Sequence, residues 1–544
     1  MKAVTAETMQ QLDRLTIELH GTPGLELMER AGHRVAEVVK SRFAGSDSRS
    51  AFIIAGKGNN GGDGFVVARL LAEAGWQISL LLFAAADAFG GDAKANLERI
   101  PSSVRQYHFQ SSSPAEIKSL LQDAAVVVDA LFGTGLKGGL SGIYVDVAQL
   151  VNACGRPVVA VDIPSGVDAD FGKVAGGAVK ADVTVTFGAA KVGQFLYPGA
   201  EYVGELIVAD IGIPSELLGK APFVEYVDEE YASALLTPRS RTAHKGSCGH
   251  ALIVAGSCGK SGAAAMAANS AMRSGAGLVT LAVPCSLHPV VEIKTTEVMT
   301  VPLPESLSGS LTLESFEQIR KLLAGRDVAA IGPGLGLHEE TKTVVLAIVT
   351  SAGVPLVLDA DALNALAGDQ SCLRASASPA LVLTPHPGEM ARLTGVSIAA
   401  IEADRVEAAR SFAAANNCYL LLKGAGTVIA APDGRLAING SGNPGMASGG
   451  MGDVLTGVIT ALLGQGYEPF AACCLGAFCH GLAGDLAAAE KGESGLIATD
   501  VQEMLPYAFK RLAEKNKSLN RNMVTSQLIQ PLNKKSRMEG SCLK

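Results

Sequence analysis

The sequence predicts an α/β fold of two tandem three-layer α/β/α domains, each a parallel sheet with helices on both faces. Short continuous apolar runs alternate with helical patterns, as expected for strands buried on both faces. This series stops at a polar, proline-containing stretch, 213–246, and then starts again. The 62 glycines and the low aromatic content of 5% also fit sheets connected by glycine-rich turns.

The first half contains six expected strands separated by helical patterns such as 65–74 and 115–122. These strands are 51–55, 78–83, 125–131, 158–161, 183–187 and 206–211. In the second half, we expect strands at 251–255, 278–283, 328–331, 355–358, 380–383, 419–422 and 427–430. The predicted domains are 1–222 and 223–514, and the Lys/Asn/Ser-rich segment 515–544 is predicted to be a disordered basic tail.

Composition narrows the class of protein. The chain has 544 residues, of which 48% are hydrophobic and 18% charged, so it can bury sizeable cores. A net charge of −8 argues against a nucleic-acid partner. We find no apolar run of about 18 residues and no apolar core of a signal peptide near the N-terminus. We therefore expect a cytoplasmic protein without a membrane span, with its scattered cysteines reduced.

A glycine cluster lies between the first expected strand and helix, at 56–64. Gly56, Gly58 and Gly61 satisfy the pattern G-x-G-x-x-G, which occurs in dinucleotide-binding dehydrogenases. The acid which that interpretation requires would be Asp87, in an alanine-rich loop. The polar residues Asn59, Asn60 and Asp63 are additional to that pattern and are typical of ligands directed into a site.

Further polar residues follow the next strands of the same half. Asp129, Asp162 and Lys191 each lie at or just after the carboxyl end of an expected strand, where open α/β sheets bind ligands. Asn60, Asp129 and Ser165 supply oxygens of the kind that hard cations prefer. The alternative for each of them is simple bracing of a loop.

The second half has its own strand-end clusters. Gly259, Lys260 and Ser261 suggest a phosphate-binding P-loop, but that motif needs glycine where Val254 stands. The segment 331–336 is another strand-to-glycine turn, and an acidic pair, 359 and 361, follows the next strand.

Two later segments carry charged groups. Lys423 ends a strand before Gly424 and Gly426, which suits nucleotide phosphates. His386 and Glu389 lie together in a proline-flanked loop, where a ligand contact and a structural role are both open.

The most informative segment is GNPGMASGGMGDVLTG, 442–457. Its glycines lead into an apolar helical pattern, which predicts a loop that places free backbone N–H groups and a helix dipole against an anion. Asp453 begins that helix, where it could accept a proton from a hydroxyl that attacks a phosphoryl group. The alternative is that Asp453 is an ordinary helix N-cap.

These motifs together resemble a known family over about residues 5–510. GNNGGDG, DALFGTG, DIPSG and FGAAKVG resemble NAD(P)H-hydrate epimerases; HKGSCGHALIVAGS, GPGLG, TPHPGE, KGAGT and GNPGMASGGMGDVLTG resemble ADP-dependent NAD(P)H-hydrate dehydratases. Both occur in this order in bacterial bifunctional NAD(P)H-hydrate repair enzymes. The resemblance implies a Rossmann-like N-terminal domain and a ribokinase-like C-terminal domain. Met451 departs from the small or hydroxyl residue that is more usual there.

The resemblance also implies an activity. The N-terminal domain would interconvert the R and S hydrates of NADH or NADPH. The C-terminal domain would phosphorylate the hydroxyl of the S hydrate with ADP, with Mg²⁺ on the nucleotide, and eliminate phosphate, leaving AMP. The protein would bind K⁺ and would be a homo-oligomer without nucleic-acid or membrane partners.

Roles for individual residues follow from the same resemblance. In the epimerase domain, the hydrate would be bound by Asn59, Asn60, Gly61, Gly62 and Asp63, by Gly133, Thr134, Gly135, Leu136, Lys137, Gly138 and Gly139, and by Asp162. Asp162 and Lys191 would transfer protons, and Asn60, Asp129 and Ser165 would bind K⁺. In the dehydratase domain, Asp453 would be the base, beside an anion hole that includes Gly449, Gly450 and Gly452. Ala263, Gly334 and His386 would contact the hydrate, and Lys423, Gly424, Ala425, Gly426 and Thr427 would hold the nucleotide.

Two other functions remain compatible with the sequence. The C-terminal domain could be a kinase of a vitamin-type alcohol that releases the phosphorylated product. The N-terminal domain could sense a nucleotide without catalysis.

Overall fold

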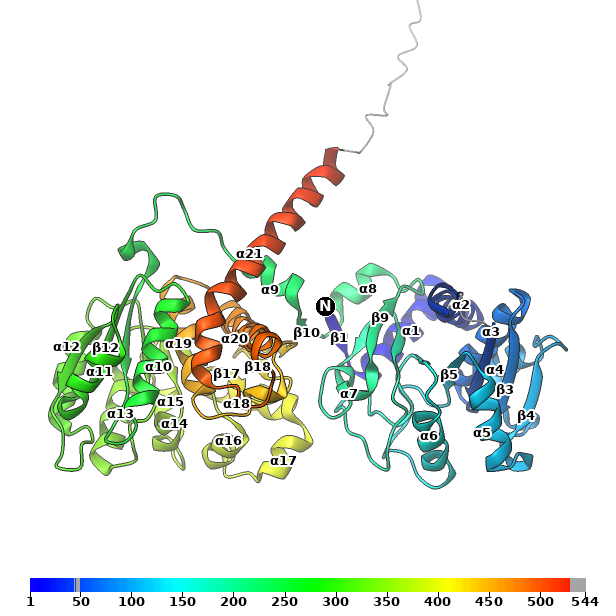
Figure 1. The fold of residues 1–544 in the computed structure, drawn as a ribbon, viewed down its shortest axis with the longest axis horizontal. Coiled ribbons are helices and arrows are strands. Elements are labelled where there is room, and N and C mark those ends of the chain that lie inside the picture. Colours follow the sequence, from blue (N-terminus) through cyan, green and yellow to red (C-terminus); the bar gives the residue numbers. More distant parts are fainter. Residues whose placement is uncertain (44, 46–48, 529–544) are drawn as a thin grey trace, which may run out of the picture. The chain divides into compact units, whose positions relative to one another are not determined.

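The computed structural model describes residues 1–43, 45 and 49–528 (Figure 1). Contacts divide the chain into two compact units. The first comprises Met1–Tyr226, Leu366–Ala375 and Val382–Gly440, and the second comprises Val227–Ala365, Ser376–Leu381 and Ser441–Lys544. The domain boundaries expected at 222/223 and 514/515 stay predictions.

The first unit contains the elements from the N-terminus to β10 and a second group from α15 to β19. Its strands are β1 (Lys2–Val4), β2 (Ser50–Ala55), β3 (Gln77–Leu82), β4 (Arg105–His108), β5 (Val126–Ala130), β6 (Val158–Val161), β7 (Val183–Phe187), β8 (Ala190–Lys191), β9 (Glu205–Ala209), β10 (Val224–Val227), β16 (Leu381–Leu383), β17 (Tyr419–Leu422), β18 (Val428–Ala430) and β19 (Leu436–Asn439). Its helices are α1 (Ala6–His20), α2 (Gly24–Phe43), α3 (Asn59–Glu73), α4 (Gly91–Leu97), α5 (Pro114–Asp123), α6 (Ile143–Ala153), α7 (Ala200–Val203), α8 (Ser215–Lys220), α15 (Ser371–Arg374), α16 (Pro387–Thr394), α17 (Ile398–Ala403) and α18 (Arg405–Asn416), with the 3-10 helices η1 (Ala86–Ala88), η2 (Phe109–Ser111) and η3 (Val192–Gln194).

A parallel sheet with the strand order β4-β3-β2-β5-β6-β7-β9 organises the N-terminal part of this unit. Alternate residues of β5 point to opposite faces: Val126 and Val128 belong to one apolar cluster, and Val127 to the other. One cluster includes Val35 of α2 and Phe65 of α3, whereas the other includes Ile117 of α5 and Val151 of α6. The result is the expected three-layer α/β/α arrangement.

A second series of strands in the first unit has the order β16-β17-β18-β19-β10-β1-β8. β17 pairs parallel with β16, whereas β18 pairs antiparallel with both β17 and β19. β1 pairs antiparallel with β10 and parallel with β8, and Val4 is opposite Lys191.

The second unit contains a parallel sheet with the strand order β13-β12-β11-β14-β15. Its strands are β11 (His250–Val254), β12 (Leu278–Pro284), β13 (Met299–Leu303), β14 (Val328–Ile331) and β15 (Leu356–Leu358). Its helices are α9 (Glu229–Leu235), α10 (Ser261–Arg273), α11 (His288–Lys294), α12 (Leu313–Leu323), α13 (Glu339–Ser351), α14 (Asp361–Ala365), α19 (Met451–Gly464), α20 (Pro469–Lys491) and α21 (Ala498–Leu528), with η4 (Lys245–Cys248), η5 (Cys285–Leu287) and η6 (Pro444–Met446).

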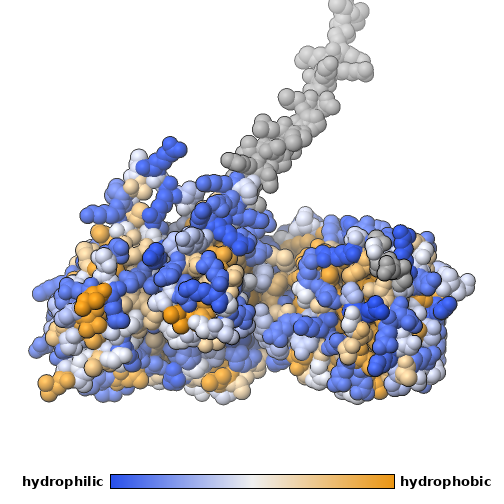
Figure 2. Space-filling view, viewed as in Figure 1, coloured by the Kyte–Doolittle hydropathy of each residue, from blue (hydrophilic) through white to orange (hydrophobic). Residues whose placement is uncertain are grey.

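α20 is long and apolar enough to cross a membrane by length and composition, which the sequence analysis did not recognise. However, 83% of its most apolar 18-residue window is buried inside the protein. It packs against α19 and α21 and is therefore a core helix of the second unit. Hydrophilic residues cover most of the face seen in Figure 2, with hydrophobic residues in small groups between them.

The predicted α/β class is confirmed, and strands 158–161, 183–187 and 328–331 have the expected bounds. Strands that the sequence analysis missed, such as β4 and β8, are short or polar and give no apolar signal. The segment from residue 515 differs from the disordered tail predicted there, because α21 continues through 515 to Leu528. Residues 529–544 of that predicted tail lie outside the described residues.

Candidate active sites

The loop after β2 brings backbone segments of the first unit very close together. A Cβ on Gly56 would lie 1.9 Å from the carbonyl oxygen of Leu131, and one on Gly61 would lie 1.8 Å from that of Gly56. Any side chain at either position would force the backbone apart. These glycines fold the loop tightly, so that α3 begins at Asn59 and buries Asn60 and Asp63 in its first turn.

Asp129 at the end of β5 is joined to Ser165 in the loop after β6. The Asp129 carboxylate is 1% exposed. It accepts hydrogen bonds from the Ser165 hydroxyl (2.6 Å) and the Ser165 backbone N–H (2.7 Å). Burial raises the pKa of Asp129, and these hydrogen bonds partly oppose that rise. The structure thus brings together two of the three predicted cation ligands.

Asn60, the third predicted cation ligand, lies against Gly133 in the loop after β5. A Cβ on Gly133 would stand 3.2 Å from Asn60 Oδ1. Asn60 Nδ2 is buried and has no hydrogen-bond partner among the described residues. Rotating the amide by 180° would place an oxygen at that position. An amide oxygen, a carboxylate and a hydroxyl are a suitable donor set for a hard cation.

The predicted loop 133–139 connects β5 to α6 and is mostly exposed or half-buried. Gly138 and Gly139 have φ of +83° and +85°, which glycine adopts without strain. A Cβ on Gly139 would lie 2.3 Å from the Ala175 carbonyl oxygen. Thr134, Gly135, Leu136 and Lys137 form the segment before this turn.

An ion pair between Asp162 and Lys191 lies at the carboxyl ends of β6 and β8. Lys191 is 1% exposed, and its Nζ donates hydrogen bonds to Asp162 Oδ1, Thr186 Oγ1 (2.8 Å) and the Phe187 carbonyl (3.2 Å). All three ammonium protons therefore have acceptors. Asp162 has a φ of +64°, an uncommon conformation for a residue with a side chain.

Asp63 and Asp13 add two more carboxylates near this pair. Burial, with a contribution from the charge of Asp162, raises the pKa of Asp63 well above its usual value. Burial also raises the pKa of Asp13 on α1 to about 6. Sequence reasoning missed Asp13 because a single carboxylate on an amphipathic helix looks like part of a solvated face.

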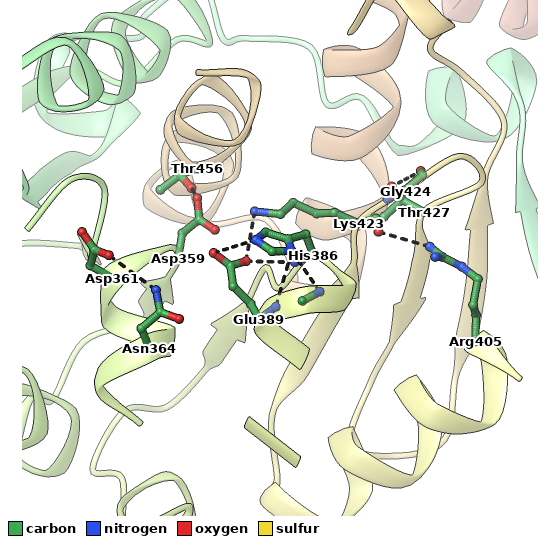
Figure 3. A network of polar contacts seen from close by, with 11 residues as sticks. Asp359, Asp361, Asn364, His386, Glu389, Arg405, Lys423, Gly424, Thr427 and Thr456 are labelled. Atoms are coloured by element: carbon green, nitrogen blue, oxygen red, sulfur yellow. Dashed lines mark hydrogen bonds and ion pairs between the residues drawn. The ribbon is translucent and has the colours of Figure 1, made fainter. Parts of the chain in front are cut away.

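His386 and Glu389 interact with each other in the first unit, at the start of α16 (Figure 3). His386 Nδ1 accepts a hydrogen bond from the Gly388 backbone N–H (3.0 Å), and the backbone N–H of His386 donates to Glu389 Oε2 (2.9 Å). The imidazole is 50% exposed, and its Nε2 lies 3.5 Å from Glu389 Oε1. His386 thus has a structural role as a helix cap, and a ligand contact stays a prediction.

Lys423 ends β17 and points toward Glu389, with Nζ 3.8 Å from Oε2 (Figure 3). The turn that follows it, 424–427, is closed by a hydrogen bond from Thr427 Oγ1 to the Gly424 carbonyl (3.0 Å). Gly424 and Gly426 have φ of +151° and +63°, with Ala425 between them. Arg405 Nη2 holds the end of β17 through the Leu422 carbonyl (3.0 Å).

In the second unit, two aspartates follow β15 (Figure 3). Asp359 is buried and accepts a hydrogen bond from Thr456 of α19 (2.8 Å). Asp361 pairs with Lys260 (2.9 Å) and accepts from the Gly336 N–H (2.8 Å). Lys260 therefore contacts a carboxylate, consistent with the failure of the P-loop motif.

The structure also brings Ala263 and Gly334 together, and their contact with the hydrate stays a prediction. A Cβ on Gly334 would lie 3.2 Å from Ala263 Cβ. Gly334 has a φ of +66°, and its carbonyl accepts a hydrogen bond from Ser257 Oγ (2.7 Å).

The segment 442–457 forms a loop followed by α19, as predicted. Asp485 of α20 holds the loop by accepting from the Gly442 N–H (3.0 Å) and Asn443 Nδ2 (2.9 Å). Gly450, with a φ of +92°, is the N-cap of α19 and makes no side-chain cap. Asp453 is in the first turn of the helix and is not its N-cap, which contradicts that alternative. Gly449 and Gly452 flank this start.

A pocket of about 490 Å³ borders the same loop. Its volume is in the range of small-molecule sites. It is lined by loop residues Pro444, Gly445, Ala447 and Ser448 and by Glu493, Ser494, Gly495, Leu496 and Ile497.

Comparisons with known proteins match both halves of the chain. A family model described as NAD(P)H-hydrate dehydratase matches residues 251–507, and one described as YjeF-related protein N-terminus matches residues 24–193. The bifunctional NAD(P)H-hydrate repair enzyme Nnr of Moorella thermoacetica is 45% identical over 523 residues, covering 94% of this chain and 98% of that protein. The enzyme of the same name from Escherichia coli is 37% identical, covering 91% and 92%.

A solved structure is also similar to part of the chain. It is the ADP/ATP-dependent NAD(P)H-hydrate dehydratase of Bacillus subtilis, co-crystallised with ATP/Mg²⁺; it is 32% identical, with a TM-score of 0.47, and the match covers 53% of this chain and 99% of that one. The two curated relatives match nearly the whole chain. The two family models match its two halves, the YjeF-related model the N-terminal half and the dehydratase model the C-terminal half. This chain therefore belongs to the family of bifunctional NAD(P)H-hydrate repair enzymes.

Proposed function

We propose that this chain repairs hydrated NADH and NADPH in two steps: epimerisation of the R and S hydrates, then ADP-dependent dehydration of the S hydrate to NAD(P)H, giving AMP and phosphate. The observation that carries the proposal is the near-full-length similarity to bifunctional repair enzymes at 45% identity. The two groups of polar residues support it, because each has the chemistry that one of the two reactions needs.

For epimerisation, we assign proton transfer to Asp162 and Lys191. Lys191 keeps the Asp162 carboxylate oriented through their ion pair. The hydrate would be bound by the first turn of α3, 59–63, and the loop 133–139, whose glycines permit close approach to phosphates.

We assign K⁺ binding to Asn60, Asp129 and Ser165. Burial makes an unneutralised Asp129 carboxylate costly, and a cation would offset that cost. K⁺ would hold the loops after β5 and β6 in place. Ser165→Ala should raise the K⁺ concentration for half-maximal epimerisation about 10-fold, as expected when one ligand is lost from a metal site. A K⁺ titration that is unchanged in Ser165→Ala would contradict this assignment.

For dehydration, we assign the base to Asp453. It would accept the proton of the substrate hydroxyl as that oxygen attacks the terminal phosphoryl group of ADP. The start of α19, including Gly449, Gly450 and Gly452, would stabilise the transferred charge with backbone N–H groups. Phosphate is a far better leaving group than hydroxide, which explains a kinase-like step in a dehydration.

We place the remaining nucleotide and substrate contacts on residues 423–427 and on Ala263, Gly334 and His386. The pocket beside 444–448 would receive part of the nucleotide, and Mg²⁺ would be bound with its phosphates. The protein would act on free cofactors in the cytoplasm, as a homo-oligomer.

The experiment that tests the proposal follows absorbance at 340 nm on a mixture of R and S hydrates of NADH. With ADP present, we expect recovery of NADH from both epimers. Recovery that stops at the S fraction would contradict the epimerase assignment. No recovery with ADP or ATP, together with phosphorylation of a vitamin-type alcohol, would replace the proposal with the kinase alternative.

A further inference from the structure

Asp13 lies on the face of α1 that packs toward Lys191. β1 runs beside β8 with Val4 opposite Lys191, and α1 starts two residues later. Met9 Cε lies 2.9 Å from the place where a Cβ on Gly188 would stand. Gly188 directly precedes the Ala189–Lys191 segment. Because residues four apart share one face of a helix, Asp13 is the next residue on the face that Met9 occupies.

The carboxylate of Asp13 is half-buried and unpaired. Among the described residues, it makes no hydrogen bond or ion pair, yet it interacts electrostatically with Lys191 and Asp162. Asp63 is also buried, at 8% exposure, and its side chain has no hydrogen-bond partner in the described part of the chain. Asp13, Asp63 and Asp162 therefore all interact electrostatically with or contact the Lys191 ammonium group, and within the described part of the chain only Asp162 forms an ion pair with it.

This arrangement matches what inversion at the hydrated carbon requires. That carbon bears a hydroxyl and is bonded to the ring nitrogen, so its configuration is lost when the C–O bond breaks and the carbon becomes planar. The leaving oxygen needs a proton from an acid, and the returning water needs a base. A buried carboxyl without an ionic partner holds its proton more readily than one paired with lysine.

We propose that Asp13 is an additional proton-transfer residue of the epimerase reaction, an inference that rests on the proposed epimerase function. The carboxylic acid of Asp13 gives its proton to the hydroxyl oxygen, and the C–O electron pair leaves with water. The ring nitrogen lone pair forms a C=N bond to the planar carbon. Water then adds to the opposite face and gives one proton to the Asp162 carboxylate, which Lys191 orients. That proton returns to Asp13 through solvent, so no atom or charge is gained or lost.

The test compares Asp13→Asn with Glu18→Gln, a matched control that removes an exposed carboxylate from the same helix. Epimerisation is measured without nucleotide, by chromatographic separation of the R and S hydrates. Dehydration of the S hydrate with ADP reports on the rest of the protein. We expect Asp13→Asn to lower the kcat of epimerisation about 100-fold, with normal dehydration, and Glu18→Gln to leave both unchanged.

The pH profile separates proton transfer from a structural role. In the wild type, kcat for epimerisation should fall as pH rises above about 6, where Asp13 loses its proton. Asp63, Asp162 and Lys191 are the charged groups that interact electrostatically with Asp13. In Asp13→Asn, this fall should vanish, whereas Asp13→Glu, which keeps a carboxylic acid, should retain it and recover at least part of the rate.

Any other outcome contradicts either the proposed epimerase function or the role of Asp13. Wild-type protein without epimerase activity contradicts the proposed function itself. Active wild type with an equally active Asp13→Asn, or a slow Asp13→Asn with an unchanged pH profile, overturns the role of Asp13. If Asp13→Asn does not fold, Asp13→Glu provides the test. The midpoint of its pH profile of kcat for epimerisation must differ from that of the wild type, and an identical midpoint overturns the proposal.

Discussion

The two proposed sites differ in how deeply their charged side chains are buried. Around Asp162, the charged groups are buried: Lys191 and Asp129 are each 1% exposed. Around the dehydratase residues the exposure is mixed: Lys260 is 48% and His386 50% exposed, whereas Asp359 and Glu389 are buried. There the start of α19 offers backbone N–H groups, which carry no titratable charge. Proton transfer to a carbon-bound hydroxyl needs shifted pKa values, whereas phosphate binding needs fixed dipoles.

Strained backbone accompanies an aspartate in both places. Asp162 after β6 has a φ of +64°, and Ala360, between Asp359 and Asp361 after β15, has a φ of +50°. Both positions lie at carboxyl ends of parallel strands. A non-glycine residue in this region costs roughly 1 kcal/mol. The neighbouring hydrogen bonds, such as that from Thr456 to Asp359, hold it there.

The largest expected effect comes from removing the proposed dehydratase base. Asp453→Asn keeps the size of the side chain but cannot accept the hydroxyl proton. Its dehydration rate should fall at least about 10³-fold, while epimerisation stays normal. Single-turnover recovery of NADH from the S hydrate measures the first rate, and chromatography of the two hydrates measures the second. Near-normal dehydration in this variant would remove Asp453 from the chemistry.

A comparable loss is expected at the other site, together with a loss of stability. Asp162→Ala should abolish epimerisation and leave dehydration intact. It also leaves the Lys191 ammonium buried without its carboxylate, which typically destabilises a protein by about 3–5 kcal/mol. The double variant Asp162→Asn/Lys191→Met should regain stability to urea but not epimerisation. Recovery of epimerisation in that double variant would show that neither charge takes part in catalysis.

A smaller effect is expected at Gly450, where the proposed dehydratase site depends on the backbone conformation at the start of α19. In Gly450→Ala, the new Cβ would lie 2.7 Å from Met266 Cε and 3.0 Å from Ala498 Cβ, at a φ of +92°. Met266 or the start of α19 must move, and an alanine is strained at this φ, so KM for ADP should rise about 10-fold, which corresponds to roughly 1.4 kcal/mol. Gly353→Ala is the control, because nothing lies within 4 Å of its new Cβ. An unchanged KM in Gly450→Ala would exclude this turn from nucleotide binding.

The sequence could predict the strands and the site residues that a local sequence pattern determines. Continuous apolar runs located β5, β6, β7 and β14, and the polar residues near the ends of β5 and β6 pointed to Asp129 and Asp162. The ion pair of Asp162 with Lys191, 29 residues apart, depends on which strands are neighbours, and so does the pairing of β1 with β8. Asp13 and Asp485 lie on helices, and their positions in the sequence pattern are typical of a helix face exposed to solvent. Their partners are set by packing, which a single sequence does not encode locally.

An effect of similar size, on stability and not on activity, is expected at the half-buried carboxylate of Asp13. The pKa of Asp13 is about 6 in the folded protein and near 3.8 when unfolded. Between pH 3.8 and pH 6 the folded protein binds a proton at Asp13 that the unfolded chain releases, so lowering the pH stabilises the folded state. Above pH 6 the ionised Asp13 carboxylate destabilises the folded state. Asp13→Asn should therefore be more stable than wild type at pH 7.5, by on the order of 1–3 kcal/mol. At pH 4 the difference should nearly vanish.

Urea unfolding of wild type, Asp13→Asn and Glu18→Gln at the two pH values measures this difference. Glu18→Gln should match the wild type at both, because its carboxylate is exposed. An Asp13→Asn variant less stable than wild type at pH 7.5 would mean that the ionised carboxylate has a stabilising partner. The contrast between buried titratable groups at one site and fixed dipoles at the other would then fail at Asp13. Since this readout involves no substrate, it tests the protonation of Asp13 independently of either activity.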